Sequence, residues 1–237
     1  MGLVIAIDGP AASGKSSTAH EVARRLGFLH VDSGALYRAL TLVALDLGEG
    51  ATAERILKAA VLRDLRMRVE EDTTRPPAHP PNRPAQRLWV LLEGSDAEPR
   101  IRSPEVTALV SPVSAMPAIR DWVNARLREL ASQDKPLVLD GRDIGTAVFP
   151  DAAIKVFLDA SPEVRARRRL EQNGQPADPA AVAAEASRIA ARDHADSTRP
   201  IAPLKAADDA VHVDSGALTF EEQVGRIVDL VRGRIGG

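Results

Sequence analysis

The sequence predicts an α/β protein organised around a parallel sheet, and three observations support this fold class. Short apolar runs of strand length alternate with segments of helical periodicity along most of the chain. Strands joined through helices in this way pair in parallel, with right-handed crossovers. The first apolar run ends in a glycine-rich loop that opens a helix. At 237 residues and 44% hydrophobic content, the chain is long enough for one large domain, or for one domain with a smaller insertion.

The glycine-rich loop is a complete GxxxxGKS phosphate-binding motif, or P-loop. It follows the apolar run at residues 3–7 and precedes a helical pattern at residues 17–26, the context that such a loop requires. Its glycines let backbone N–H groups close around a phosphate chain, its lysine reaches the β- and γ-phosphates, and its serine ligates Mg²⁺. A turn without a ligand is the alternative, and the flanking strand and helix favour triphosphate binding. The candidate triphosphate-binding residues are Gly9, Pro10, Ala11, Ala12, Ser13, Gly14, Lys15, Ser16 and Ser17, with Lys15 also a catalytic candidate and Ser16 a metal ligand.

The chain after the P-loop helix continues the alternation and then departs from it. A short strand is expected at residues 28–31, followed by a helix that Asp32 or Ser33 caps and that runs to about Leu47. A further helix is expected at residues 53–62. Alternating apolar residues within 65–102 predict an antiparallel hairpin inserted into the fold. The proline-rich segment 73–84 at its tip is interpreted as a long, mobile loop without a function of its own.

The second half of the chain returns to alternating helices and strands. Helices are expected at residues 104–114, 117–131, 162–170, 179–194 and 220–231, and strands at residues 136–139, 154–158 and 211–213. Ligands of open parallel sheets bind beyond the carboxyl ends of the strands. We therefore expect the P-loop, Asp32 with Ser33, and residues 140–143 to surround one crevice.

Arginine is the abundant cation of this chain, with 26 arginines against 5 lysines. Arg38 and Arg142 each follow a predicted strand end, and Arg192 and Arg199 flank a turn expected at residues 193–198. Planar guanidinium groups suit an enzyme that must hold two anionic partners together, because phosphoryl transfer is mainly positioning and charge stabilisation.

A further arginine run lies at residues 165–169. On a helix, Arg165, Arg168 and Arg169 share one face, which predicts a mobile lid that closes over a triphosphate. A solvated helix face is the alternative, and the glycine and prolines that follow the run favour the lid.

Composition excludes several function classes. The formal net charge of −2 provides no overall field for nucleic acid or an anionic membrane. The absence of cysteine excludes disulfides and thiolate chemistry, and the five histidines lack metal-binding spacing. No apolar run approaches a membrane span and no cleavable leader is evident, so a cytoplasmic location is expected.

Five motifs carry a family resemblance over most of the chain. They are IDGPAASGKSS at residues 5–17, VDSGALYRA at 31–39, DGRDIGTAVFPDA at 140–152, FLDAS at 157–161, and the RD and RPIAPL stretch at 192–204. Together they resemble bacterial cytidylate kinase. The resemblance implies a P-loop three-layer sandwich with a five-stranded parallel sheet. It also implies a core of residues 1–32, 104–161 and 197–237, a nucleoside-monophosphate region at 33–103 with an antiparallel insertion at 65–102, and a lid at 162–196.

The resemblance also assigns substrate-binding residues. Those expected around the phosphate and sugar of CMP are Ser33, Tyr37, Arg38, Arg142, Arg192, Asp196 and Arg199. Those expected at the cytosine edge are Ser111, Arg120 and Asp143, because a carboxylate accepts from the exocyclic amino group while a guanidinium donates to the ring acceptors. An internal ion pair between Arg120 and Asp143 is the alternative. Arg165, Arg168 and Arg169 look like lid arginines that approach ATP, and Arg142 is a further catalytic candidate.

The sequence therefore predicts a Mg²⁺-dependent kinase that transfers the γ-phosphoryl group of ATP to CMP or dCMP. A monomer without nucleic-acid or membrane partners is expected. A kinase of UMP, dTMP or shikimate is one alternative. A non-enzymatic nucleotide-switch protein is another, although the guanine-reading NKxD pattern of GTPases is absent from the sequence.

Overall fold

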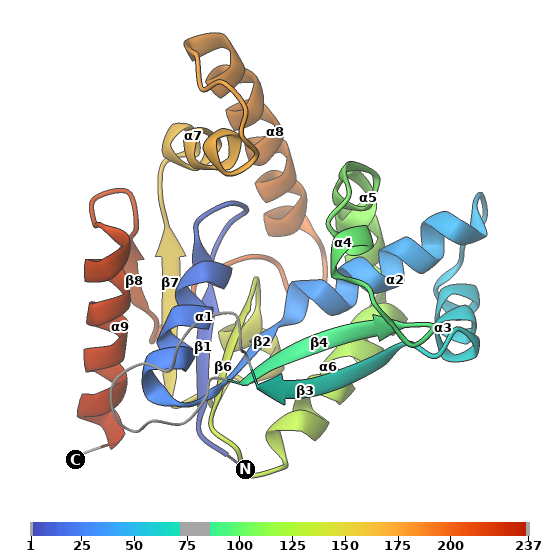
Figure 1. Ribbon diagram of the computed structural model, residues 1–237, viewed down its shortest axis with the longest axis horizontal. Coiled ribbons are helices and arrows are strands. Elements are labelled where there is room, and N and C mark those ends of the chain that lie inside the picture. Colours follow the sequence, from blue (N-terminus) through green and yellow to red (C-terminus); the bar gives the residue numbers. More distant parts are fainter. Residues whose placement is uncertain (1, 72–85, 236–237) are drawn as a thin grey trace.

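The computed structural model describes residues 2–71 and 86–235 and contains the predicted parallel sheet. Its five core strands are β2 (Leu29–Asp32), β6 (Leu137–Gly141), β1 (Val4–Asp8), β7 (Ile154–Asp159) and β8 (Val211–Asp214), in that spatial order. Every neighbouring pair among these five strands is parallel. Figure 1 shows the P-loop at the carboxyl end of β1, in the middle of this sheet. The α/β fold class with five parallel core strands is confirmed.

Helices cover both faces of the sheet and make a three-layer sandwich (Figure 1). Alternate residues of β1 enter different cores, since Ile5 and Ile7 face one layer while Val4 and Ala6 face the other. The first layer contains α1 (Lys15–Leu26) and α9 (Phe220–Ile235), and the second contains α2 (Ser33–Leu47) and α6 (Pro117–Ala131). Both faces of the strands are buried, which explains why β1 reads as a continuous apolar run.

The predicted insertion forms an antiparallel hairpin of β3 (Arg66–Glu71) and β4 (Gln86–Leu92), extended by the short β5 (Ser95–Asp96). β4 also pairs in parallel with β2, through Leu29 with Gln86 and His30 with Arg87. The insertion therefore continues the core sheet, a join that the sequence did not reveal. The loop predicted at residues 73–84 falls outside the described residues.

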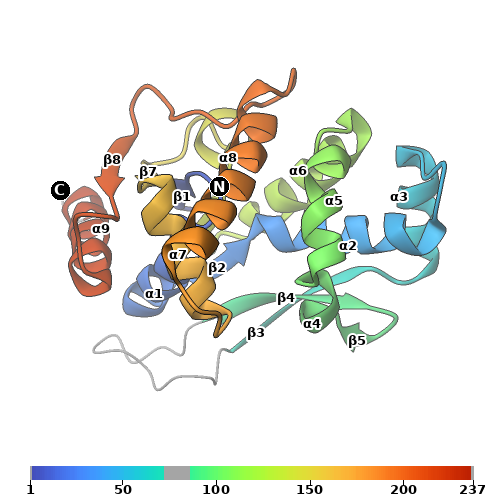
Figure 2. The same cartoon turned by 90° about the horizontal axis from the view of Figure 1, so that it is seen from above.

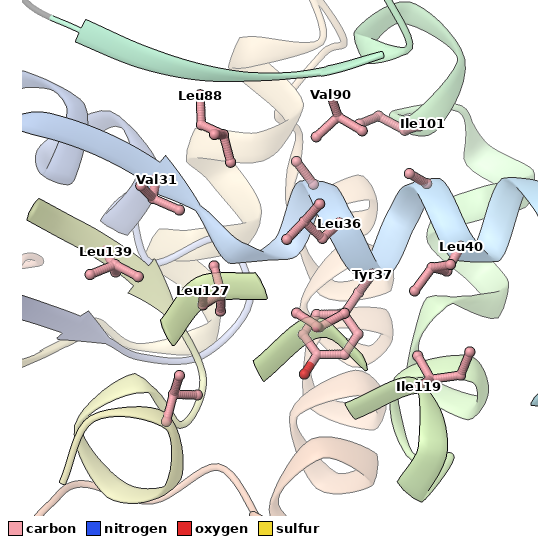
Figure 3. Close-up of a cluster of buried hydrophobic side chains, with 14 of the residues drawn as sticks. Val31, Leu36, Tyr37, Leu40, Leu88, Val90, Ile101, Ile119, Leu127 and Leu139 are labelled. Carbon is pink, nitrogen blue, oxygen red and sulfur yellow. The ribbon is translucent and has the colours of Figure 1, made fainter. Parts of the chain in front are cut away.

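Helix α2 connects the insertion to the core. Figure 3 shows Leu36 and Leu40 on α2, with Leu88 and Val90 of β4 on one side and Ile119 of α6 on the other. These five side chains are buried, so α2 has apolar partners on both sides. Ser33, Tyr37 and Arg38 of the predicted site lie on its first turns. Three further helices pack against α2, namely α3 (Ala53–Leu62), α4 (Glu98–Ile101) and α5 (Pro104–Ser114).

A helical hairpin of α7 (Pro162–Gln172) and α8 (Pro179–Thr198) stands beyond the carboxyl end of β7 (Figures 1 and 2). The turn expected at residues 193–198 is wrong, because α8 continues through these residues. The hydroxyls of Ser197 and Thr198 donate to the carbonyl of His194 in this last turn. Arg199 then has an extended backbone, as expected for a residue before proline. The sequence also missed α4 and the wide turn η1 (Ile144–Val148) after β6.

Candidate active site

A cleft of about 250 Å³ opens at the carboxyl ends of β1, β2 and β6. The P-loop, the start of α2, the segment after β6 and four further helices contribute its walls. Six of the predicted P-loop residues line this cleft, namely Ala12, Ser13, Gly14, Lys15, Ser16 and Ser17, whereas Gly9, Pro10 and Ala11 do not. The other predicted site residues that line it are Ser33, Tyr37, Arg38, Ser111, Arg120, Arg142, Asp143, Arg169, Arg192, Asp196 and Arg199. The crevice expected from the strand ends is therefore present.

The P-loop has the backbone conformation that its glycines permit. Gly14 has a φ of +85°, which favours glycine, and α1 begins at the next residue. A Cβ on Gly9 would lie 2.1 Å from the carbonyl oxygen of Leu158, so no larger residue fits there. Residues 14–17 at the start of α1 line the cleft, and a helix N-terminus favours an anion. The loop is thus shaped for a phosphate chain.

Lys15 is buried at the centre of the P-loop, where its Nζ donates to the carbonyl of Pro10 at 2.8 Å. Burial, and secondly the positive charge of Arg142, lower the pKa of Lys15 to about 7. A triphosphate beside this ammonium would reverse the shift, because a negative charge favours the protonated form.

Ser16 and Asp140 supply oxygen atoms next to the P-loop. Ser16 Oγ donates to Asp140 Oδ2, and His30 Nε2 lies 2.8 Å from Asp140 Oδ1. Hydroxyl and carboxylate oxygens suit Mg²⁺, which takes one or two protein ligands and completes its shell with phosphates and water. In the described ranges, no group of three or more His, Cys, Asp or Glu side chains could hold a metal ion on its own. The donors present therefore fit a magnesium ion that arrives with a nucleotide.

Asp143 is held between two arginines on the opposite wall. Its Oδ2 accepts from Arg120, and its Oδ1 accepts from Arg199 Nη2 at 3.1 Å. Burial raises the pKa of Asp143, and the charges of Arg120 and Arg199 oppose that rise. Arg120 is only 2% exposed, so the Asp143 carboxylate compensates a buried positive charge. The ion pair considered from the sequence is present, and both partners also line the cleft.

Asp196 joins two more of the predicted residues. Arg142 Nε donates to Asp196 Oδ2 at 3.0 Å, and Ser111 Oγ donates to Asp196 Oδ1 at 3.2 Å. Tyr37 lies beside this network, with the Arg120 guanidinium 5.5 Å from its ring centroid. Its hydroxyl is buried and has no hydrogen-bond partner among the described residues. An unpaired buried hydroxyl is costly, which favours a ligand group in the cleft.

Arg38 and Arg192 bring further positive charge into the same volume. Burial, and then neighbouring arginines, lower the pKa of Arg38 to about 10 and that of Arg192 to about 9. The neighbours with the largest effect are Arg102 for Arg38 and Arg142 for Arg192. Guanidinium groups lower one another's pKa when their positive charges are not balanced by nearby anions. An anionic ligand would therefore stabilise this arginine-rich wall of the cleft.

The three predicted lid arginines of α7 do not all lie in one place. Arg169 lines the main cleft and pairs with Glu185 at 3.1 Å. Arg168 donates to Ser215 and lines, together with Arg169, a second cavity of about 400 Å³ beside the P-loop. Arg165 is buried and lines neither cavity, because its guanidinium is bonded to Ala160, Ala11 and Asp193. Arg168 and Arg169 thus share a cavity, as expected from their spacing, whereas Arg165 lies apart from them.

Asp32, which was expected at the crevice, lines the cleft and accepts from Arg102 Nη2 at 2.9 Å. Sequence reasoning missed two other residues at the site. Arg102 also lines the cleft, although its local sequence carries no signal beyond its place at the end of the insertion. His30 lies in β2, two residues before Asp32, which pairs with Asp140 of β6. Alternate residues of a strand share one face, so the spacing of His30 and Asp32 was the available signal for His30.

A P-loop beside a separate wall of arginines defines the class of P-loop kinases that act on small acceptors. The comparisons with known proteins specify the class further: the family model described as cytidylate kinase matches residues 5–233. The chain belongs to the cytidylate kinase family.

Named cytidylate kinases match this chain over nearly its whole length. The enzyme of Geobacillus sp. (strain WCH70) is 42% identical over 232 residues, which cover 98% of this chain and 97% of that protein. The enzyme of Mycobacterium avium (strain 104) is 44% identical over 236 residues, covering 98% and 96%. In the described part of the chain, no helix has the length and apolar character needed to cross a membrane.

Proposed function

We propose that this protein is a cytidylate kinase that transfers the γ-phosphoryl group of ATP to CMP or dCMP, giving ADP and the nucleoside diphosphate. The observation that carries the proposal is the junction of a P-loop and an arginine-rich wall within one cleft, in a chain that matches cytidylate kinases over its full length. The family match favours this activity over the alternatives of a UMP, dTMP or shikimate kinase and of a nucleotide switch.

Lys15 and the P-loop amides bind the triphosphate in this proposal. The Lys15 ammonium contacts the β- and γ-phosphates, and the N-terminus of α1 stabilises the charge that they carry. Ser16, with Asp140 behind it, would hold Mg²⁺. When bound, Mg²⁺ neutralises charge on the β- and γ-phosphate oxygens. Arg168 and Arg169 approach the same phosphates from α7.

The acceptor phosphate is held by Arg38, Arg142, Arg192 and Arg199. A phosphate monoester has a second pKa of about 6, so the acceptor oxygen is ionised near neutral pH and no general base is required. Ser33, Tyr37 and Asp196 are placed to contact phosphate and sugar. Alignment of two anions within one cleft, with water excluded from the reacting atoms, is the main contribution of the protein.

Ser111, Arg120 and Asp143 read the base in this proposal. Asp143 accepts from the exocyclic amino group of cytosine, where uracil and thymine have a carbonyl oxygen. A buried carboxylate facing that carbonyl lacks its donor, a mismatch of about 1 to 3 kcal/mol. The two arginines on Asp143 keep it in place for this contact. A lid at residues 162–196, a monomeric state, a cytoplasmic location and the absence of a nucleic-acid partner remain predictions of the sequence.

Steady-state ADP release with CMP, dCMP, UMP, dTMP and shikimate as acceptors tests the proposal. CMP and dCMP should give the highest kcat/KM. Arg120→Ala and Asp143→Ala should lower kcat/KM for CMP, while Asp151→Ala, at an exposed position, serves as the surface control. Folded protein that leaves ATP intact with CMP and magnesium present would refute the kinase assignment. Equal losses in the site variants and the control would refute the base-reading assignment alone.

A further inference from the structure

Ala11 of the P-loop makes polar contacts through both of its main-chain groups. Its N–H donates to Asp193 Oδ1 at 2.8 Å, and its carbonyl accepts from Arg165 Nη1 at 2.8 Å. Arg165 Nη1 also lies 2.5 Å from Asp193 Oδ2, which closes the arrangement. Arg165 comes from α7 and Asp193 from α8. Two consecutive helices that lie far from the P-loop in sequence therefore hold one of its peptide segments.

Apolar packing supports the same junction. The Ala11 methyl group lies in a small buried cluster with Ala166 and Leu170 of α7 and with Val182 and Ile189 of α8. Ala11 is 1% exposed. The base of the α7 and α8 hairpin and the P-loop thus form one packed unit, because both the side chain and the backbone of Ala11 belong to it.

The bonds of Arg165 oppose its sequence-based role as an arginine that approaches ATP. Its Nε donates to the carbonyl of Ala160 at 2.9 Å, and its Nη1 is shared by Ala11 and Asp193. Arg165 is 5% exposed and lines neither cavity beside the P-loop. A contact with phosphate would require these bonds to break and would leave the Asp193 carboxylate without its buried partner.

We propose that Arg165 and Asp193 are positioning residues that act on ATP binding through the main chain of Ala11. By fixing both polar groups of that peptide segment, they hold the P-loop in the curvature that the phosphate chain requires before ATP arrives. This preorganisation lowers the cost of ordering the loop on binding. Asp193 also follows Arg192, so the same contact fixes the turn of α8 that presents Arg192 to the cleft. The inference rests on the proposed function for its nucleotide, ATP.

Single and paired substitutions separate positioning from plain stability. Arg165→Met and Asp193→Leu each leave one buried partner uncompensated, whereas the double variant removes both charges and keeps similar volume. Replacing a buried ion pair by apolar groups is often neutral for stability. We therefore expect the double variant to regain the unfolding free energy that the single variants lose. Its Kd for ATP, measured by calorimetry without acceptor, should stay about 10- to 100-fold above that of the unchanged protein, since P-loop curvature is not restored.

Two further measurements examine the Ala11 contact itself. Amide hydrogen exchange at Ala11 should become faster in Asp193→Leu and in the double variant. Asp193→Asn keeps an acceptor for the Ala11 N–H and should recover part of the ATP affinity. The paired change Arg63→Met with Asp46→Asn, at an ion pair far along the chain, is the control and should leave Kd for ATP unchanged.

Three results would overturn the inference. One is a double variant whose ATP affinity returns together with its stability, since the pair would then serve the fold alone. Another is an Arg165→Met variant that loses kcat while Asp193→Leu retains it, because Arg165 would then touch the reacting phosphates. The third is unchanged exchange at Ala11. Failure of the proposed function has a different signature, namely ATP binding by the unchanged protein with no transfer to CMP.

Discussion

The two sides of the cleft bind anions by different means. The P-loop side uses backbone N–H groups in one short turn, with Lys15 and Ser16 as the added side chains. The opposite side uses side chains from α2, α5, α6, α8 and the segment after β6, and several of these are already paired with each other. The P-loop side depends on the conformation of one short backbone segment, which Arg165 and Asp193 contact at Ala11. The other depends on the convergence of distant elements and on charge balance, so substitutions should affect the two sides differently.

The largest expected effect comes from removing the single cation of the P-loop. Lys15→Met should lower kcat/KM for the kinase reaction by about 10³-fold, because it removes the charge that contacts the phosphates. CMP affinity should change little, since the arginines of the opposite wall are intact. Steady-state ADP release and calorimetric titration with CMP measure the two quantities. A parallel loss of CMP affinity would show that the two sides are not separable.

The second effect concerns charge balance on the opposite wall. Asp143→Ala leaves the guanidinium of Arg120 buried without its carboxylate, which should lower the free energy of unfolding by about 3 kcal/mol. Urea denaturation measures this loss, with Asp151→Ala as an exposed control expected to change stability by about 0.5 kcal/mol or less. ATP affinity should be retained. Stability equal to that of the control would contradict the dependence of Arg120 on Asp143.

A third prediction uses pH to distinguish the two sides. The pKa of Lys15 is lowered to about 7, mainly by burial, so at pH 8 most of the ligand-free protein carries a neutral amine. ATP restores the charge, and binding should take up close to one proton at pH 8 and fewer at pH 6. Calorimetry in two buffers of different ionisation enthalpy measures this uptake, and Lys15→Met should abolish it. In the ligand-free protein the unfolded state holds more protons, so this group makes stability rise with pH from about 7 to 10.5.

The smallest effect tests whether the helices that carry the acceptor wall act only as supports. Ser103 Oγ accepts from the N–H of Val106 at the start of α5, the helix that brings Ser111 to the cleft. Ser103→Ala should cost about 1 kcal/mol of stability, as loss of an N-cap does. Thermal unfolding measures the cost, and KM for CMP should change less than twofold. A large rise in KM would mean that α5 contacts the acceptor more directly.

The difference between the two sides of the cleft also explains which features the sequence could predict. The P-loop is contiguous, and its chemistry follows from spacing alone, so the strand, turn and helix around Gly14 and Lys15 were predictable. The parallel core was predictable as well, because its central strands β1 and β6 are buried on both faces and read as continuous apolar runs. The join of β4 to β2 was not, since the pairing of Leu29 with Gln86 depends on register between segments far apart in the chain.

The separation of Arg165 from Arg168 and Arg169 illustrates a second limit. Helical spacing places the three on adjoining positions, but it contains no information about what packs against each one. Arg165 meets Asp193 and Ala11, while Arg168 meets Ser215. The turn wrongly expected at residues 193–198 had a related cause, because the polar residues there end a helix as readily as they form a loop.

The shared carboxylate of Asp143 has a consequence for redesign of the acceptor. Its two oxygens serve Arg120 and Arg199, so altering that one residue disturbs three charges together. A library aimed at a different pyrimidine should therefore vary these positions jointly, with total charge conserved, because single exchanges would lower the free energy of unfolding as well as change selectivity.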